Sequence, residues 1–175
     1  LRMTHDQVKA EVAASVARAK GYTADIEYSP EDGFRSDPDF MCEVCQIAVD
    51  NGANTINIPD TVGYGLPQDF GALIAYVIDT VKGDYVVSTH CHDDLGLAVA
   101  NSLAGVAAGA RQVECAINGL GERAGNASLE ELVMAMKVRN DVLPYWTNVD
   151  STLLTRASKL VAAATSFPVQ YNKAI

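Results

Sequence analysis

Segments with the periodicity of strands alternate with segments of helical periodicity along almost the whole chain. The predicted strands cover residues 24–31, 55–61, 85–92 and 112–118. The predicted helices cover residues 4–20, 39–51, 67–82, 97–108 and 128–140, and capping boxes that pair Thr4 with Gln7 and Ser128 with Glu131 open the first and the last of them. Short connections between alternating elements favour parallel strands joined by right-handed crossovers. The sequence therefore predicts an α/β fold built on a parallel sheet.

The polar side chains of the predicted strands distinguish an open sheet from a barrel. In an open, doubly wound sheet, helices cover both faces of the inner strands, which then read as continuous apolar runs. Here one face is apolar, and the other carries Glu27, Ser29, Glu31, Asn57, Thr61, Ser88, His90, His92, Glu114 and Asn118. Polar groups that converge at the carboxyl ends of parallel strands are typical of the mouth of a (β/α)8 barrel.

The length limits how much of a barrel this chain can form. A complete barrel has eight strands and about 250 residues, whereas the chain has 175 residues. We therefore expect a TIM barrel of which only about the last four β/α units are present. Residues 1–143 would form this C-terminal half of the barrel, and residues 144–175 would begin a helical region with a helix over about 150–166.

Charge and hydropathy exclude several classes of partner. The formal net charge of −9 argues against binding to nucleic acid or to an anionic membrane. The sequence shows no run of about 18 apolar residues and no charged-then-apolar leader. We expect a soluble, cytoplasmic protein in which an anionic substrate depends on local arginines.

Cys42 and Cys45 form a Cys-x-x-Cys pair, a pattern also found in zinc and redox sites. The pair lies in a helical pattern in which small apolar side chains would face a core, and the chain offers no second pair to complete a four-sulfur site. We interpret both residues as reduced thiols of the core.

His90 and His92 stand one residue apart where the third predicted strand ends. Alternate side chains of a strand point to the same face, so the two imidazoles are expected on one side and Cys91 on the other. This spacing suits a metal ion, although a pair of hydrogen-bonding histidines would show the same pattern. Two aspartates and a glycine follow directly, which gives His-x-His-Asp-Asp-x-Gly.

This block is one of four that resemble the α-isopropylmalate synthase/homocitrate synthase family. The four blocks cover residues 28–32, 57–64, 90–96 and 118–131, in the family's order and at natural spacing, so the resemblance spans nearly the whole chain. Residues 121–131, Gly-Glu-Arg-Ala-Gly-Asn-Ala-Ser-Leu-Glu-Glu, are closer to the isopropylmalate synthase branch than to the homocitrate synthase branch. The citramalate and methylthioalkylmalate synthase branches share these blocks.

The resemblance implies a Claisen-type condensation of acetyl-CoA with an α-keto acid, which is 2-oxoisovalerate in the isopropylmalate branch of leucine biosynthesis. It also implies a divalent cation (Mn²⁺, Mg²⁺ or Zn²⁺) as Lewis acid, with His90, His92 and Asn126 among its ligands. On local grounds Asn126 reads equally well as a loop or capping residue. The family's remaining ligand is an aspartate in an Arg-Asp-Gly motif, and this sequence contains no such motif.

The same resemblance assigns substrate contacts. Glu31 is the implied catalytic carboxylate, Ser29 and Thr61 would line the keto-acid pocket, and Gly121 with Arg123 would hold part of acetyl-CoA at a helix N-terminus. For the first three residues the plain alternative is polar lining of a barrel rim. For Arg123 it is a structural network with Glu122.

Two other classes of function are compatible with the sequence. A half barrel could serve as a non-catalytic module that docks to the missing half, or the chain could belong to a phosphate-binding barrel without metal dependence. In the full-length enzyme the resemblance implies a homodimer.

Overall fold

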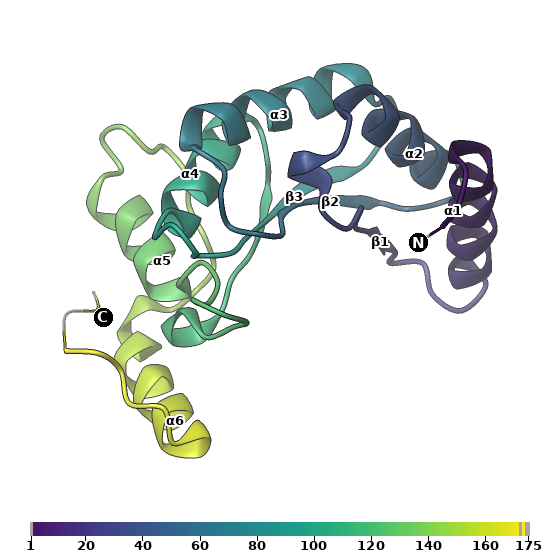
Figure 1. Ribbon diagram of the computed structural model, residues 1–175. Helices are drawn as coiled ribbons and strands as arrows, with labels where there is room; N and C mark the ends of the chain where they lie inside the picture. The colour runs from purple at the N-terminus through teal and green to yellow at the C-terminus, as the bar shows by residue number, and fades with distance from the viewer. Residues whose placement is uncertain (1, 172, 174–175) are drawn as a thin grey trace.

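The computed structural model describes residues 2–171 and 173, so both expected domain ranges, 1–143 and 144–175, include residues outside the described part. Four parallel strands form one sheet in the order of the chain (Figure 1): β1 (Glu27–Tyr28), β2 (Thr55–Asp60), β3 (Val86–Cys91) and β4 (Gln112–Glu114). The α/β fold with a parallel sheet is confirmed, and its four strands correspond to part of a barrel.

The α-helices connect and follow these strands: α1 (His5–Lys20), α2 (Pro38–Asp50), α3 (Pro67–Thr80), α4 (Ala98–Ala108), α5 (Leu129–Val138) and α6 (Leu154–Thr165). Short 3-10 helices cover Gly33–Arg35, Ile117–Gly119 and Ser151–Leu153. In Figure 1 α2, α3 and α4 arch over one face of the sheet, which leaves the opposite face open.

The core lies between the sheet and these helices. Ile56 and Ile58 of β2 are fully buried, as are Phe70, Ile74 and Val77 of α3. Cys42 and Cys45 are free, buried thiols, and burial raises the pKa of Cys45 to about 12. Their interpretation as core residues is confirmed.

The open face of the sheet is concave. Gln112 of β4 donates from Nε2 to Glu27 Oε2 of β1 at 2.8 Å, although two strands separate β1 from β4. In a flat sheet three strand spacings of about 4.8 Å would keep these side chains apart. The contact therefore shows that the strands curve toward this face, as the wall of a barrel does.

One predicted capping box is confirmed and one is wrong. Thr4 and Gln7 bond reciprocally at the start of α1. At α5 the Ser128 side chain caps no backbone amide, and its hydroxyl donates instead to Glu130 Oε2 at 2.9 Å. The buried Glu130 carboxylate also accepts from the Asn118 amide, so Glu130 rather than Glu131 ties the start of α5 to the preceding loop.

The outer strands are shorter than predicted. Among the described residues β1 pairs with β2 alone, over two residues, and β4 ends at Glu114. The chain cannot stay extended as far as Asn118, because that residue has the left-handed backbone angle φ = 62°.

The segment after α5 folds back onto the barrel half. Leu154 and Ser158 of α6 are buried, and the Ser158 carbonyl accepts from Asn118 Nδ2 at 3.1 Å. Within residues 2–171 and 173, no helix has the length and apolar character needed to cross a membrane.

Candidate active site

The two histidines lie at the carboxyl end of β3 on the concave face. His90 is its penultimate residue and His92 follows its last, and their Nε2 atoms lie 3.1 Å apart. The expectation that both imidazoles project to one side is confirmed. Burial and the neighbouring His90 lower the pKa of His92, which favours the neutral imidazole that a metal ion requires.

The next strand supplies a carboxylate behind His90. Glu114 stands directly opposite His90 in the register of β3 and β4, and its Oε2 lies 2.6 Å from His90 Nδ1. Glu27 approaches from β1, and burial, followed by the neighbouring Glu114 carboxyl, raises the pKa of Glu27 to about 7. The strand pattern predicts both glutamates on the polar face, but it does not indicate a role for either.

The loop between β4 and α5 places Asn126 beside His92. The two residues form an antiparallel bridge, and Asp93 donates its amide to the Gly125 carbonyl at 2.9 Å. Asn126 Oδ1 is buried and has no hydrogen-bond partner within residues 2–171 and 173. A Cβ at Gly121 would lie 2.6 Å from Asn126 Cγ, so glycine at position 121 lets the loop pass against this side chain.

These atoms fit a divalent cation. Two nitrogen ligands of one octahedral cation, each about 2.1 Å from it, lie about 3 Å apart, which is close to the observed Nε2 separation of 3.1 Å. The buried Asn126 Oδ1, unpartnered in the described part of the chain, offers a further oxygen ligand. Among the described residues no group of three or more His, Cys, Asp or Glu side chains could hold a metal.

Arg123 is held by protein groups on two other loops. Its Nε and Nη2 bind the Asp94 carboxylate at 2.8 and 3.0 Å, and Nη2 also donates to the Thr61 carbonyl at 2.7 Å. Asp94 raises the pKa of Arg123, and Arg123 lowers the pKa of Asp94. Glu122 is the partner considered from the sequence, and its Oε2 lies 3.7 Å from Arg123 Nη1. The closer partner, Asp94, was missed in the sequence analysis.

The remaining predicted residues lie at the carboxyl ends of β1 and β2. Thr61 Oγ1 accepts from the Asp32 amide at 3.0 Å, and Ser29 Oγ accepts from Asn57 Nδ2 at 2.7 Å. Each hydroxyl therefore keeps its own hydrogen available to a ligand. Glu31 is exposed in the turn three residues after the end of β1.

Asp60, at the end of β2, is a structural carboxylate of this mouth. It is fully buried and accepts from the Gly65 amide at 2.9 Å, the Tyr64 amide at 3.3 Å and Asn101 Nδ2 at 3.4 Å. These bonds order the turn into α3.

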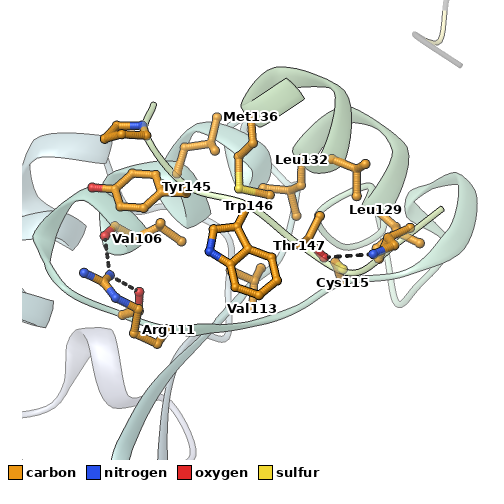
Figure 2. Close-up of a pocket in the computed structure, with 15 residues that line it drawn as sticks. Val106, Arg111, Val113, Cys115, Leu129, Leu132, Met136, Tyr145, Trp146 and Thr147 are labelled. Atoms are coloured by element: carbon orange, nitrogen blue, oxygen red, sulfur yellow. Dashed lines mark hydrogen bonds between the residues drawn. The ribbon is translucent and has the colours of Figure 1, made fainter. Parts of the chain in front are cut away.

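Two cavities lie near these loops. One, of about 340 Å³, is bounded by the loop between β4 and α5 and by the segment after α6, including Gly121, Arg123, Phe167 and Gln170. The other, of about 530 Å³, is largely apolar and lies between α4, α5 and residues 144–149, where Trp146 and Tyr145 cover it (Figure 2). The second cavity holds none of the predicted site residues.

The fold and site together define part of a parallel β/α barrel with two neighbouring histidines at its mouth. The chain matches the HMGL-like family over residues 1–161 and belongs to that family.

The 2-isopropylmalate synthases of Rhodopseudomonas palustris (strain BisA53) and Bradyrhizobium sp. (strain ORS 278) are 59% and 60% identical to the whole chain. The chain spans 34% of the length of these relatives. Among solved structures, hydroxymethylglutaryl-CoA lyase from Pseudomonas aeruginosa superposes with a TM-score of 0.76 over 95% of this chain and 58% of its own, at 22% identity. The HMG-CoA lyase from Bacillus subtilis gives 0.74 over 96% and 57%, at 18% identity. These two structures support the fold.

Proposed function

We propose that this chain is part of a 2-isopropylmalate synthase. The reaction joins acetyl-CoA, 2-oxoisovalerate and water to give 2-isopropylmalate and free CoA, through attack of the acetyl methyl carbon on the keto carbonyl. The observation that carries the proposal is the identity of 57–60% to 2-isopropylmalate synthases over the full chain, joined to the paired histidine nitrogens at the barrel mouth.

His90, His92 and Asn126 would hold the divalent cation through Nε2, Nε2 and Oδ1. When bound, this cation supplies Lewis-acid stabilisation of the negative charge that develops on the keto oxygen. The neutral state of His92, favoured by its lowered pKa, keeps a lone pair free for this role. The family resemblance implies one further ligand, an aspartate of an Arg-Asp-Gly motif, and this sequence contains no such motif.

The substrate contacts follow from the free donors and acceptors. Thr61, whose Oγ1 already accepts from Asp32, can donate its hydrogen to the keto-acid carboxylate, and Ser29 can donate in the same way. Glu31 presents an exposed carboxylate at the same edge as acceptor for a proton from the acetyl methyl group. The cavity of about 340 Å³ beside Gly121 and Arg123 is the place proposed for part of acetyl-CoA.

The full-length protein would act as a cytoplasmic homodimer. The second candidate reaction is condensation with another keto acid, because citramalate, methylthioalkylmalate and homocitrate synthases share the sequence blocks. A non-catalytic half-barrel module is the alternative of a different class, and it predicts no activity even when the rest of the barrel is present.

The test replaces each histidine in the full-length protein. His90→Ala and His92→Ala should each lower CoA release by about 10³-fold, since a Lewis acid contributes several kcal/mol to the transition state. Bound metal should fall in both variants, while His5→Ala on α1, remote in sequence from the site, should retain activity. Full activity and unchanged metal content in either site variant would contradict the proposal.

A further inference from the structure

Glu114 is the nearest charged group to the imidazole of His90. Its Oε2 lies 2.6 Å from His90 Nδ1, while the other ring nitrogen of His90 faces His92. Both side chains are mostly covered, with exposed fractions of 33% for Glu114 and 27% for His90. The two ring nitrogens of His90 therefore have separate partners, a carboxylate behind and the candidate metal site in front.

The sheet fixes this arrangement from the backbone outward. Glu114 and His90 are register partners on adjacent parallel strands, so their side chains leave the same face of the sheet next to each other. Gln112, two residues before Glu114 on the same face of β4, donates from Nε2 to Glu27 Oε2 of β1 at 2.8 Å. The register of β3 and β4 and the contact with His90 thus fix the position of Glu114.

A carboxylate accepts hydrogen bonds and donates none, so the Glu114 contact favours a proton on His90 Nδ1. A histidine that donates from one ring nitrogen presents the lone pair of the other, and its basicity as a ligand rises. We propose that Glu114 is a positioning residue that holds His90 as the Nδ1–H tautomer and thereby directs its Nε2 lone pair into the metal site. This inference rests on the function proposed above.

The first test measures Mn²⁺ affinity of the full-length protein by calorimetry. Glu114→Ala should raise the Kd about 10–100-fold, the usual effect of losing such a partner of a metal ligand. Glu114→Gln should raise it by a smaller factor, because the amide oxygen still accepts from Nδ1 but without charge. Glu43→Gln removes a carboxylate that pairs with Lys9 on the outer helices, and it should leave the Kd unchanged.

The second test reads the tautomer directly in the metal-free protein. With ¹⁵N-labelled histidine, and His90→Ala to assign the signal, NMR should show His90 protonated at Nδ1 in the wild type. In Glu114→Ala the proton should redistribute toward Nε2. A purely structural ion pair would leave both the tautomer and the metal affinity of a folded variant unchanged.

The outcomes separate the two proposals. If His90→Ala and His92→Ala weaken Mn²⁺ binding but folded Glu114→Ala matches the wild type in affinity and tautomer, the role of Glu114 is overturned and the metal site stands. If the histidine variants bind Mn²⁺ like the wild type, the proposed metal site itself is overturned. Should circular dichroism show that Glu114→Ala does not fold, unchanged affinity in Glu114→Gln overturns the positioning role.

Discussion

The two faces of β3 differ in both packing and chemistry. On the side that faces the helices, Thr89 packs against Gly105 of α4 so closely that a Cβ added at residue 105 would lie 2.6 Å from Thr89 Cγ2. Cys91 on the same side is almost fully buried. Toward the concave side, His90 meets Glu114 and His92, and Ser88 Oγ is buried without a partner. The covered face supplies the close packing that holds the strand, while the concave face displays polar groups whose hydrogen-bonding capacity is only partly used. Because its side chains alternate, β3 contributes to packing with one face and presents the candidate site residues on the other.

The largest loss of activity is expected for the 175-residue polypeptide alone, in which the concave face of the sheet is uncovered. A purified polypeptide of these 175 residues should release no CoA from acetyl-CoA with any keto acid, and should bind metal weakly, because the aspartate ligand implied by the family resemblance belongs to an Arg-Asp-Gly motif that this sequence does not contain. Its outermost strands, β1 and β4, offer unpaired edges that favour self-association. Sedimentation and a CoA-release assay, after intact-mass verification, check both expectations, and turnover like that of an enzyme would show that the site is complete in this chain.

A change on the covered face should instead act on stability. Phe70 of α3 is fully buried, so Phe70→Ala should lower the free energy of unfolding by about 3–5 kcal/mol. Thr89→Val is the matched contrast, because the Thr89 hydroxyl is buried without a partner, and its removal should be neutral or slightly stabilising. Denaturant titration of the full-length protein measures both. A small loss for Phe70→Ala would mean that this face contributes less to stability than its burial indicates.

The loops at the mouth should show an intermediate effect. Lysine cannot reproduce the two parallel bonds from Arg123 to Asp94, so Arg123→Lys should raise the KM for acetyl-CoA by about threefold to tenfold. Arg139 makes the same paired bonds to Asp141 away from the site, which makes Arg139→Lys the control. Equal KM values for acetyl-CoA in both variants, measured by steady-state kinetics, would contradict a role for Arg123 in acetyl-CoA binding.

Periodicity predicted the parts of this arrangement that depend on neighbours in sequence. The helix and strand order and the common side of His90 and His92 follow from local spacing. The pairing of Arg123 with Asp94 spans 29 residues and required the loops to be placed in space. The contact of Glu114 with His90 depends on the register of β3 and β4, which no local pattern reveals. Glu130, and not the predicted Glu131, stabilises the start of α5, because the backbone amide of Asn118 donates to the Glu130 carboxylate.

The smallest effect concerns the pH dependence of stability. The pKa of Glu27 is raised from its ordinary value near 4.5 to about 7 in the folded protein, so between these values the folded state binds more protons than the unfolded state. The contribution of Glu27 to stability is therefore present below about pH 4.5 and is lost as the pH rises to about 7. Glu27→Gln should remove this part of the slope, and urea unfolding of both proteins at several pH values measures it. Parallel pH profiles for the two proteins would contradict the raised pKa.

The central claim is tested most directly by the kcat/KM for CoA release by the full-length protein with different keto acids, with each product identified by mass. We expect 2-oxoisovalerate to be preferred over pyruvate and 2-oxoglutarate by about tenfold or more, a ratio that pocket fit alone can provide. A preference for pyruvate or 2-oxoglutarate would assign the chain to another branch with the same barrel. The absence of CoA release with every keto acid, in a folded protein supplied with Mn²⁺ or Mg²⁺, would contradict the proposed reaction.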